Sequence, residues 1–206
     1  MPAYPAGRQC NARGLTALGR HLIRAMMARH MLIEVDHLSE RARESVLRMA
    51  EAARYPLVSS HTDTGGTWTT RDLRRLYAVG GFATARPDTA GPLASRILQL
   101  SRLAPGGVGL GTDTGGFAAL PGPRAGAAQN PLHYPFRSFD GHVRFMRERT
   151  GERVFDLNTD GVAHYGLFAD LLADIQRTRR GMAALRVLFR SAEAYLETWQ
   201  RAVAHA

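Results

Sequence analysis

Three stretches decide the fold of this chain: residues 31–37 (MLIEVDH), 55–61 (YPLVSSH) and 106–113 (GGVGLGTD). Each is a short apolar run that ends in a side chain able to bind a metal ion, namely His37, His61 or Asp113. The spacings of 24 and 52 residues are about one and two strand-plus-helix units. We therefore expect all three groups at the same end of a parallel sheet, where metal hydrolases collect their ligands.

Helical patterns alternate with these runs. We expect strands over residues 31–36, 56–60, 80–85 and 106–113, and helices over residues 16–29, from 39 to the second strand, 72–79, 92–103, from 164, and from 182 to the end. Thr16 and Ser39 are the predicted N-caps of the first two helices. The alternation predicts right-handed crossovers and a parallel sheet.

Four such strands with their helices make half of an eight-stranded barrel. The predicted fold class is α/β, a partial (β/α)8 TIM-type barrel of about four parallel strands with flanking helices and a long loop insertion. We expect a single domain over residues 1–206, with residues 114–160 as a lid or insertion. The first part of that segment is rich in Gly, Pro, Ala and Asn and is too long for a simple connector.

The composition is that of an ordinary globular chain, 45% apolar and 22% charged. The net charge of +9 comes from arginines spread along the whole length. One explanation is codon usage in a high-GC genome, and the alternative is a basic surface that binds nucleic acid. Because no nucleic-acid-binding motif accompanies the arginines, we expect no nucleic-acid partner. A single cysteine, Cys10, excludes an intrachain disulfide and a cysteine metal cluster. No apolar run is long enough for a transmembrane segment or a signal peptide.

Each strand-end residue has a structural alternative. A histidine at the end of a strand can be a hydrogen-bonded residue of the core or rim, but two histidines at equivalent positions favour a ligand role. Asp113 can simply form the turn before Thr114. Gly109 and Gly111 share its face of the strand, however, and leave space for a metal ion or a substrate.

These segments resemble the membrane dipeptidase (renal dipeptidase) family, binuclear zinc hydrolases of the amidohydrolase superfamily. The stretch GLTALGRHLIRAMMARHMLIEVDHLS resembles the approach to the family's fifth strand, YPLVSSH its continuation, and GVGLGTDTGG its GLGSDFDG motif. The closing segments HYGLFADLL and LFRSAEAYLETW resemble the family's last elements, so the resemblance covers about residues 14–203. It implies strands equivalent to strands 5 to 8 of the barrel.

The resemblance also implies roles for individual residues. His37 and His61 stand at the positions of two zinc ligands, and Asp113 at that of the active-site aspartate, a metal ligand that handles the catalytic proton. Arg71 is a candidate for holding the substrate carboxylate. Independently of the family, His164 is a candidate substrate-binding residue because it precedes a helix in a loop of functional type; its alternative is a structural role. The complete family site holds two divalent ions, and this chain alone would hold one zinc ion or none.

The sequence departs from the family pattern in ways that bear on activity. The His-x-Asp pair of the family's first strand and its metal-bridging Glu would both lie upstream of anything that aligns here. Glu34 replaces an Asp, Gly115 replaces the second motif aspartate, and His-Thr-Asp at 61–63 replaces His-Ser-Asn. This chain therefore corresponds to a C-terminal half.

Two classes of function remain open. The first is a metal-dependent hydrolase that cleaves dipeptide-like substrates and needs the missing N-terminal half, with a phosphoesterase-like amidohydrolase as its enzymatic rival. The second is a truncated or degenerate, non-catalytic barrel fragment that acts as a binding or interaction protein. Because half a barrel exposes sheet edges, we expect a homodimer or pairing with a missing N-terminal half. The sequence leaves the localisation open, with a soluble, cytoplasmic chain as the default and a parent protein that can be exported.

Overall fold

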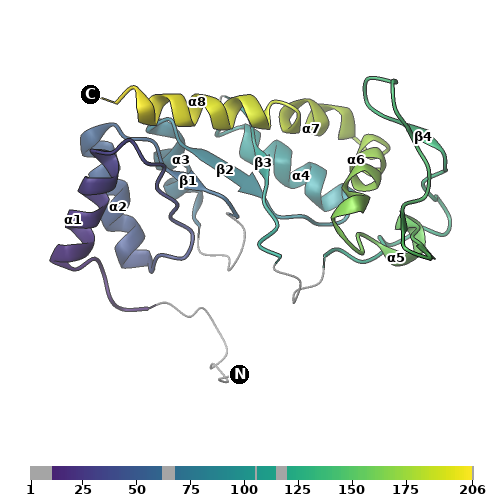
Figure 1. Ribbon diagram of the computed structural model, residues 1–206, viewed down its shortest axis with the longest axis horizontal. Helices are drawn as coiled ribbons and strands as arrows, with labels where there is room; N and C mark the ends of the chain where they lie inside the picture. The colour runs from purple at the N-terminus through teal and green to yellow at the C-terminus, as the bar shows by residue number, and fades with distance from the viewer. Residues whose placement is uncertain (1–10, 62–67, 105, 115–119, 206) are drawn as a thin grey trace. The chain divides into compact units, whose positions relative to one another are not determined.

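The computed structural model describes residues 11–61, 68–104, 106–114 and 120–205 (Figure 1). The chain divides into two compact units. Unit 1 comprises Met1–Thr84 and Ala192–Ala206, and unit 2 comprises Ala85–Ser191. A single domain over residues 1–206 stays a prediction.

Unit 1 is a mixed helical and strand unit. Its elements are α1 (Ala17–Met27), α2 (Glu40–Ala53), β1 (Val58–Ser59), α3 (Thr70–Ala78), β2 (Phe82–Ala85) and α8 (Ser191–Val203), with the unit boundaries at the end of β2 and the start of α8. From α2 to β2 the order is helix, strand, helix, strand, as predicted. The strand predicted at residues 31–36 is only an isolated bridge.

The helices of unit 1 start where hydroxyl side chains can cap them. The side chains of Thr16, Ser39 and Thr69 accept hydrogen bonds from amides three residues later, at 3.0 to 3.1 Å. Each bond satisfies one of the amides that has no partner within the first helical turn. Helix α2 ends at Ala53, and its C-cap, Arg54, adopts the left-handed conformation with φ 53°. The backbone amide of Arg54 donates to the carbonyls of Ala50 and Glu51 in the last turn of the helix.

The strands of unit 1 are short and parallel. Residues 33–35 form an isolated bridge, Glu34 with Val58, with Val58 donating to the carbonyl of Ile33 at 2.9 Å. β1 pairs in turn with β2, in the register Val58 to Phe82. A Cβ at Gly81 would lie 2.5 Å from the carbonyl oxygen of Leu57, so only glycine allows this close approach.

The core of unit 1 lies between these strands and helices α2 and α3. Its most buried side chains come from the bridged residues, α2, the segment before β1, and α3: Ile33, Val35, Val46, Leu47, Tyr55, Leu57, Leu73 and Leu76. Each large aliphatic side chain contributes roughly 1.5–3 kcal/mol by leaving water. Helix α8 completes the unit, because Thr198 donates to the carbonyl of Gly80 at 3.1 Å and the ring of Tyr195 meets that of Phe82 edge-on.

Unit 2 combines helices, short strands and long connecting segments. Its elements are α4 (Ala90–Ser101), β3 (Gly109–Leu110), β4 (Phe136–Arg137), β5 (Arg144–Phe145), β6 (Arg149–Thr150), β7 (Arg153–Val154), α5 (Leu157–Asp160), the 3-10 helix η1 (Tyr165–Leu167), α6 (Phe168–Gln176) and α7 (Gly181–Leu188). Helices α4, α6 and α7 pack on one another around Leu93, Ile97, Leu171 and Leu185.

The segment 114–160 carries more structure than its composition indicates. It contains two antiparallel hairpins, β4–β5 and β6–β7, and the short helix α5. Its role as a lid stays a prediction. The single closing helix expected from residue 182 is also interrupted, since α7 ends at Leu188 and α8 begins at Ser191.

The strand order of the three-stranded sheet is β1-β2-β3. The structure is therefore mixed α/β with a parallel sheet and flanking helices, as predicted at this level. The count of about four strands and their equivalence to strands 5 to 8 stay predictions. In the part of the chain that the structure describes, every helix is too short or too polar to cross a membrane.

Candidate metal centre

The two candidate histidines lie at the carboxyl ends of neighbouring parallel segments in unit 1. His37 follows the bridged residues 33–35, and His61 follows β1. Their Nε2 atoms lie 2.8 Å apart, and the two rings are tilted by 40° with centroids 4.7 Å apart. The structure therefore brings together the two histidines that the sequence singled out.

The spacing of this pair is close to that of two imidazoles on one metal ion. Two imidazoles on a tetrahedral zinc, with Zn–N near 2.0–2.1 Å, place their nitrogens about 3.3 Å apart. The Nε2 atoms of His37 and His61 would need to separate by roughly 0.5 Å to reach that spacing. His37 is exposed, so its ring can make this adjustment, whereas the side chain of His61 is only 13% exposed.

The side chain of Asp36 links the ends of the two parallel segments through hydrogen bonds. Its carboxylate accepts hydrogen bonds from the hydroxyl of Ser59, from the backbone amide of His61 at 2.8 Å and from Nε1 of Trp68 at 2.8 Å. The Asp36 side chain is 3% exposed. The indole of Trp68 lies under the guanidinium of Arg43, 4.7 Å from the ring centroid.

Glu34 and Asp36 form a second acidic group beside His61. The ligand-type atoms of these three residues lie within 4.8 Å of one another. Burial, followed by the hydrogen bond and the charge of Asp36, raises the pKa of Glu34. Burial opposes ionisation of Asp36 too, but hydrogen bonds from Glu34, Ser59, His61 and Trp68 outweigh it and lower the pKa of Asp36. Because donors already occupy these oxygens, this group fits a hydrogen-bonded support better than a metal site.

Asp113 lies in unit 2, in the turn that follows β3. Its φ of 50° is left-handed, a conformation that aspartate tolerates better than most residues. The hydroxyl of Tyr165 braces this turn by donating to the carbonyl of Thr114 at 2.7 Å and lying 2.9 Å from Oγ1 of Thr112. Since His37 and His61 belong to unit 1, the convergence of all three candidates stays a prediction.

Arg71 lies in the first turn of α3 with a 76% exposed side chain. Its guanidinium is 3.5 Å from the carboxylate of Asp72 and 3.8 Å from that of Glu44. These are surface ion pairs, which contribute little to stability. The role of Arg71 in holding a substrate carboxylate stays a prediction.

His164 is the N-cap of η1, where its Nδ1 accepts a hydrogen bond from the amide of Gly166 at 3.1 Å. Its ring meets that of Phe155 edge-on, with centroids 4.6 Å apart. These contacts give the residue a structural role, and its substrate contact stays a prediction. Gly115 and residues 62–63, which depart from the family pattern, lie outside the described residues.

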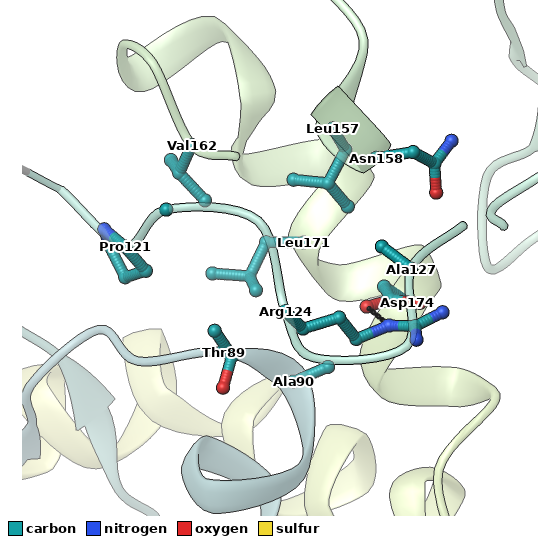
Figure 2. A pocket seen from close by; sticks show the side chains of 11 residues that line it. Thr89, Ala90, Pro121, Arg124, Ala127, Leu157, Asn158, Val162, Leu171 and Asp174 are labelled. Carbon is teal, nitrogen blue, oxygen red and sulfur yellow. Dashed lines mark hydrogen bonds and ion pairs between the residues drawn. The ribbon is translucent and has the colours of Figure 1, made fainter. Parts of the chain in front are cut away.

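Two of the hollows among the described residues of unit 2 differ in character. A small cavity of about 10 Å³, with room for about one water molecule, lies beside Arg124, whose Nε donates to the buried Asp174 at 2.6 Å (Figure 2). A larger groove of about 500 Å³ lies between the β4–β5 hairpin and helices α6 and α7, and four phenylalanines are among the residues that line it. The first is too small for a substrate, and the second lacks a pair of groups suited to hydrolysis.

Sequence reasoning missed Asp36, Ser59, Trp68 and Tyr165. Asp36 had a visible signal, a carboxylate inside a strand beside a ligand-type histidine. Ser59 and Trp68 had none, because their contacts with Asp36 join residues 23 and 32 positions apart.

The N-terminal part of the chain matches a known family. The sequence model of the membrane dipeptidases, peptidase family M19, matches residues 3–69, a segment that contains both His37 and His61. This match confirms the resemblance noted from the sequence. A search of curated protein sequences found no match.

Solved structures share the fold over most of this chain. An amidohydrolase from Pseudomonas aeruginosa is 15% identical, with a TM-score of 0.55 over 92% of this chain and 57% of that chain. The family M19 metallopeptidase described as dipeptidase AC is 20% identical, with a TM-score of 0.58 over 95% and 51%. A metallopeptidase from Rhodobacter sphaeroides, liganded with a phosphinate mimic of the dipeptide L-Ala-D-Ala, is 20% identical, with a TM-score of 0.57 over 95% and 49%. This chain therefore spans about half the length of the solved structures it matches.

Proposed function

We propose that this relative of the membrane dipeptidases carries part of the active site of a metal-dependent hydrolase that cleaves the amide bond of dipeptide-like substrates. The observation that carries the proposal is the pair of Nε2 atoms of His37 and His61, 2.8 Å apart at the ends of two parallel strands. The pair lies within the segment that matches the family.

The donor set favours a borderline-soft divalent ion. Neutral imidazole nitrogens suit zinc, whereas magnesium and calcium prefer oxygen ligands. In the proposal, His37 and His61 hold zinc through Nε2. When bound, such an ion supplies Lewis acidity that activates water and polarises a carbonyl.

The remaining roles follow from the sequence motif. Asp113 is the third metal-binding group and moves the proton from the attacking water to the leaving amine. Arg71 holds the terminal carboxylate of the substrate and His164 contacts it. Support for Asp113 comes from its position after β3 of a parallel sheet, in a turn that Tyr165 braces. The phosphinate bound to the Rhodobacter sphaeroides metallopeptidase makes L-Ala-D-Ala a suitable first substrate to test.

In the proposal, turnover needs more than these groups. His37, His61 and Asp113 supply the three protein ligands of one hydrolytic zinc ion, whereas the complete site of the family holds two ions. We therefore propose that full activity needs a complementary N-terminal half or a second copy of the chain. The alternative is a non-catalytic fragment that binds a partner.

Zinc binding tests the proposal directly. The full chain should bind zinc in a competition assay with a chelating dye, and His37→Asn and His61→Asn should each weaken binding roughly tenfold or more, a loss above about 1.4 kcal/mol. His21→Asn is the matched control, because His21 is exposed on α1. Equal binding by all four proteins would remove both histidines from the site.

Hydrolysis tests the chemistry separately. Zinc-loaded protein is assayed with L-Ala-D-Ala, and Asp113→Asn should abolish any turnover. An unchanged rate in that variant would rule out the role of Asp113. Zinc binding without hydrolysis of any dipeptide, even when a complementary N-terminal half is supplied, would support the non-catalytic alternative.

A further inference from the structure

The two ring nitrogens of His61 face different environments. Nε2 faces the imidazole of His37 at 2.8 Å. Nδ1 faces the hydroxyl oxygen of Ser60 at 2.8 Å and a carboxylate oxygen of Asp36 at 3.4 Å. A neutral imidazole carries its proton on one nitrogen only, so these neighbours decide which nitrogen has a free lone pair.

Ser60 alone does not make this choice. Its hydroxyl can accept a hydrogen bond from a protonated Nδ1 or donate one to an unprotonated Nδ1, so it suits either tautomer. The carboxylate of Asp36 only accepts, and it would face a lone pair on an unprotonated Nδ1. Asp36 therefore favours a proton on Nδ1 and a lone pair on Nε2.

Asp36 is held in place for this task. Its carboxylate is nearly buried and accepts from the Ser59 hydroxyl, the His61 amide and the Trp68 indole. The bond to the His61 amide also fixes the backbone that carries the ring. The carboxylate thus sets both the position of His61 and the electrostatic field at Nδ1.

We propose that Asp36 is a positioning residue that holds His61 in the Nδ1-protonated tautomer and so directs the Nε2 lone pair toward the ion. The significance for metal binding rests on the proposed function, whereas the tautomer itself does not. Carboxylates that orient metal-binding histidines typically change metal affinity by about 10- to 100-fold when removed.

The test compares the wild type with Asp36→Asn, using Glu193→Gln on the exposed surface of α8 as the control. The tautomer of His61 is read from long-range ¹H–¹⁵N spectra of the metal-free protein at about pH 8, above the ordinary histidine pKa of about 6.5. The His61 signals are assigned by their loss in His61→Asn. Wild type and control should show Nδ1–H, and Asp36→Asn should shift the ratio toward Nε2–H by about tenfold, because an amide can donate to Nδ1.

Zinc titration gives the second readout. Asp36→Asn should weaken zinc binding by at least about tenfold, and the control should leave it unchanged. An unaltered His61 tautomer in a folded Asp36→Asn protein overturns the proposal, whatever the zinc affinity. A shifted tautomer in a chain that binds no zinc supports the positioning role and rejects the proposed function instead. If Asp36→Asn does not fold, the wild type decides alone: Nδ1–H as the main tautomer of His61 supports the proposal, and Nε2–H overturns it.

Discussion

The indole of Trp68 provides a sensitive test of the support beneath the histidine pair. In Trp68→Phe the aromatic ring remains over the guanidinium of Arg43, but the hydrogen bond from Nε1 to Asp36, 2.8 Å in the wild type, is lost. The variant therefore separates this one bond from most of the packing around it.

The expected loss can be worked from that bond. A hydrogen bond to a charged group contributes about 1.5–3 kcal/mol, and Oδ1 of the nearly buried Asp36 side chain would keep the Ser59 hydroxyl as a donor but lose the indole. We expect the free energy of unfolding to fall by about 2 kcal/mol, which for a chain of this length lowers the melting temperature by about 4–8 °C.

The assay is urea unfolding followed by far-ultraviolet circular dichroism. The control is Trp199→Phe on α8, since the Trp199 side chain is 48% exposed and a surface change of this kind alters stability by less than about 0.5 kcal/mol. If both variants lose the same small amount, the bond to Asp36 does not support the fold and the reasoning fails.

Three further predictions concern other parts of the molecule. Burial raises the pKa of Asp170, so the protonated carboxyl stabilises the folded state most at low pH. The difference in unfolding free energy between wild type and Asp170→Asn should therefore fall as the pH rises above about 4. A difference that stays constant up to about pH 7 would contradict this. Gly81→Ala should lower the free energy of unfolding in urea by about 1–3 kcal/mol, because its Cβ would lie 2.5 Å from a backbone oxygen. Gly91→Ala, in open space on α4, is the control and should be neutral or stabilise by up to about 1 kcal/mol. Similar effects at both sites would disprove the close approach. Tyr165→Phe removes the hydroxyl that hydrogen-bonds to Thr112 and Thr114 beside Asp113. The kcat for L-Ala-D-Ala should then fall by up to about tenfold. An unchanged kcat in a protein with measurable turnover would show that these hydrogen bonds have no role in activity.

The parts of the fold that depend on local patterns could be predicted from the sequence. Thr16 and Ser39 cap their helices as expected, because a cap involves residues three positions apart. The meeting of His37 and His61 could also be predicted, because parallel strands align their carboxyl ends.

Features that depend on distant contacts could not be predicted in this way. The hairpins within residues 114–160 are two-residue strands, too short to give an alternating pattern. The hydrogen bond from Trp68 to Asp36 joins residues 32 positions apart, so no local pattern indicates it. The break between α7 and α8 lies inside one continuous apolar pattern, and the sequence shows no proline or glycine there.

The return of α8 to unit 1 has a consequence for synthesis. Unit 1 is discontinuous, since residues after position 191 join the first 84. His205 lies 2.6 Å from the carbonyl oxygen of Ala53, a contact that spans 152 positions. On the ribosome, the segment bearing both histidines must therefore wait for residues 192–205 to emerge before its native packing is complete, while unit 2 is a continuous segment that can fold as it emerges. A nascent chain stalled when unit 2 has left the exit tunnel but residues 192–205 have not would present a folded second unit and an unfinished first one.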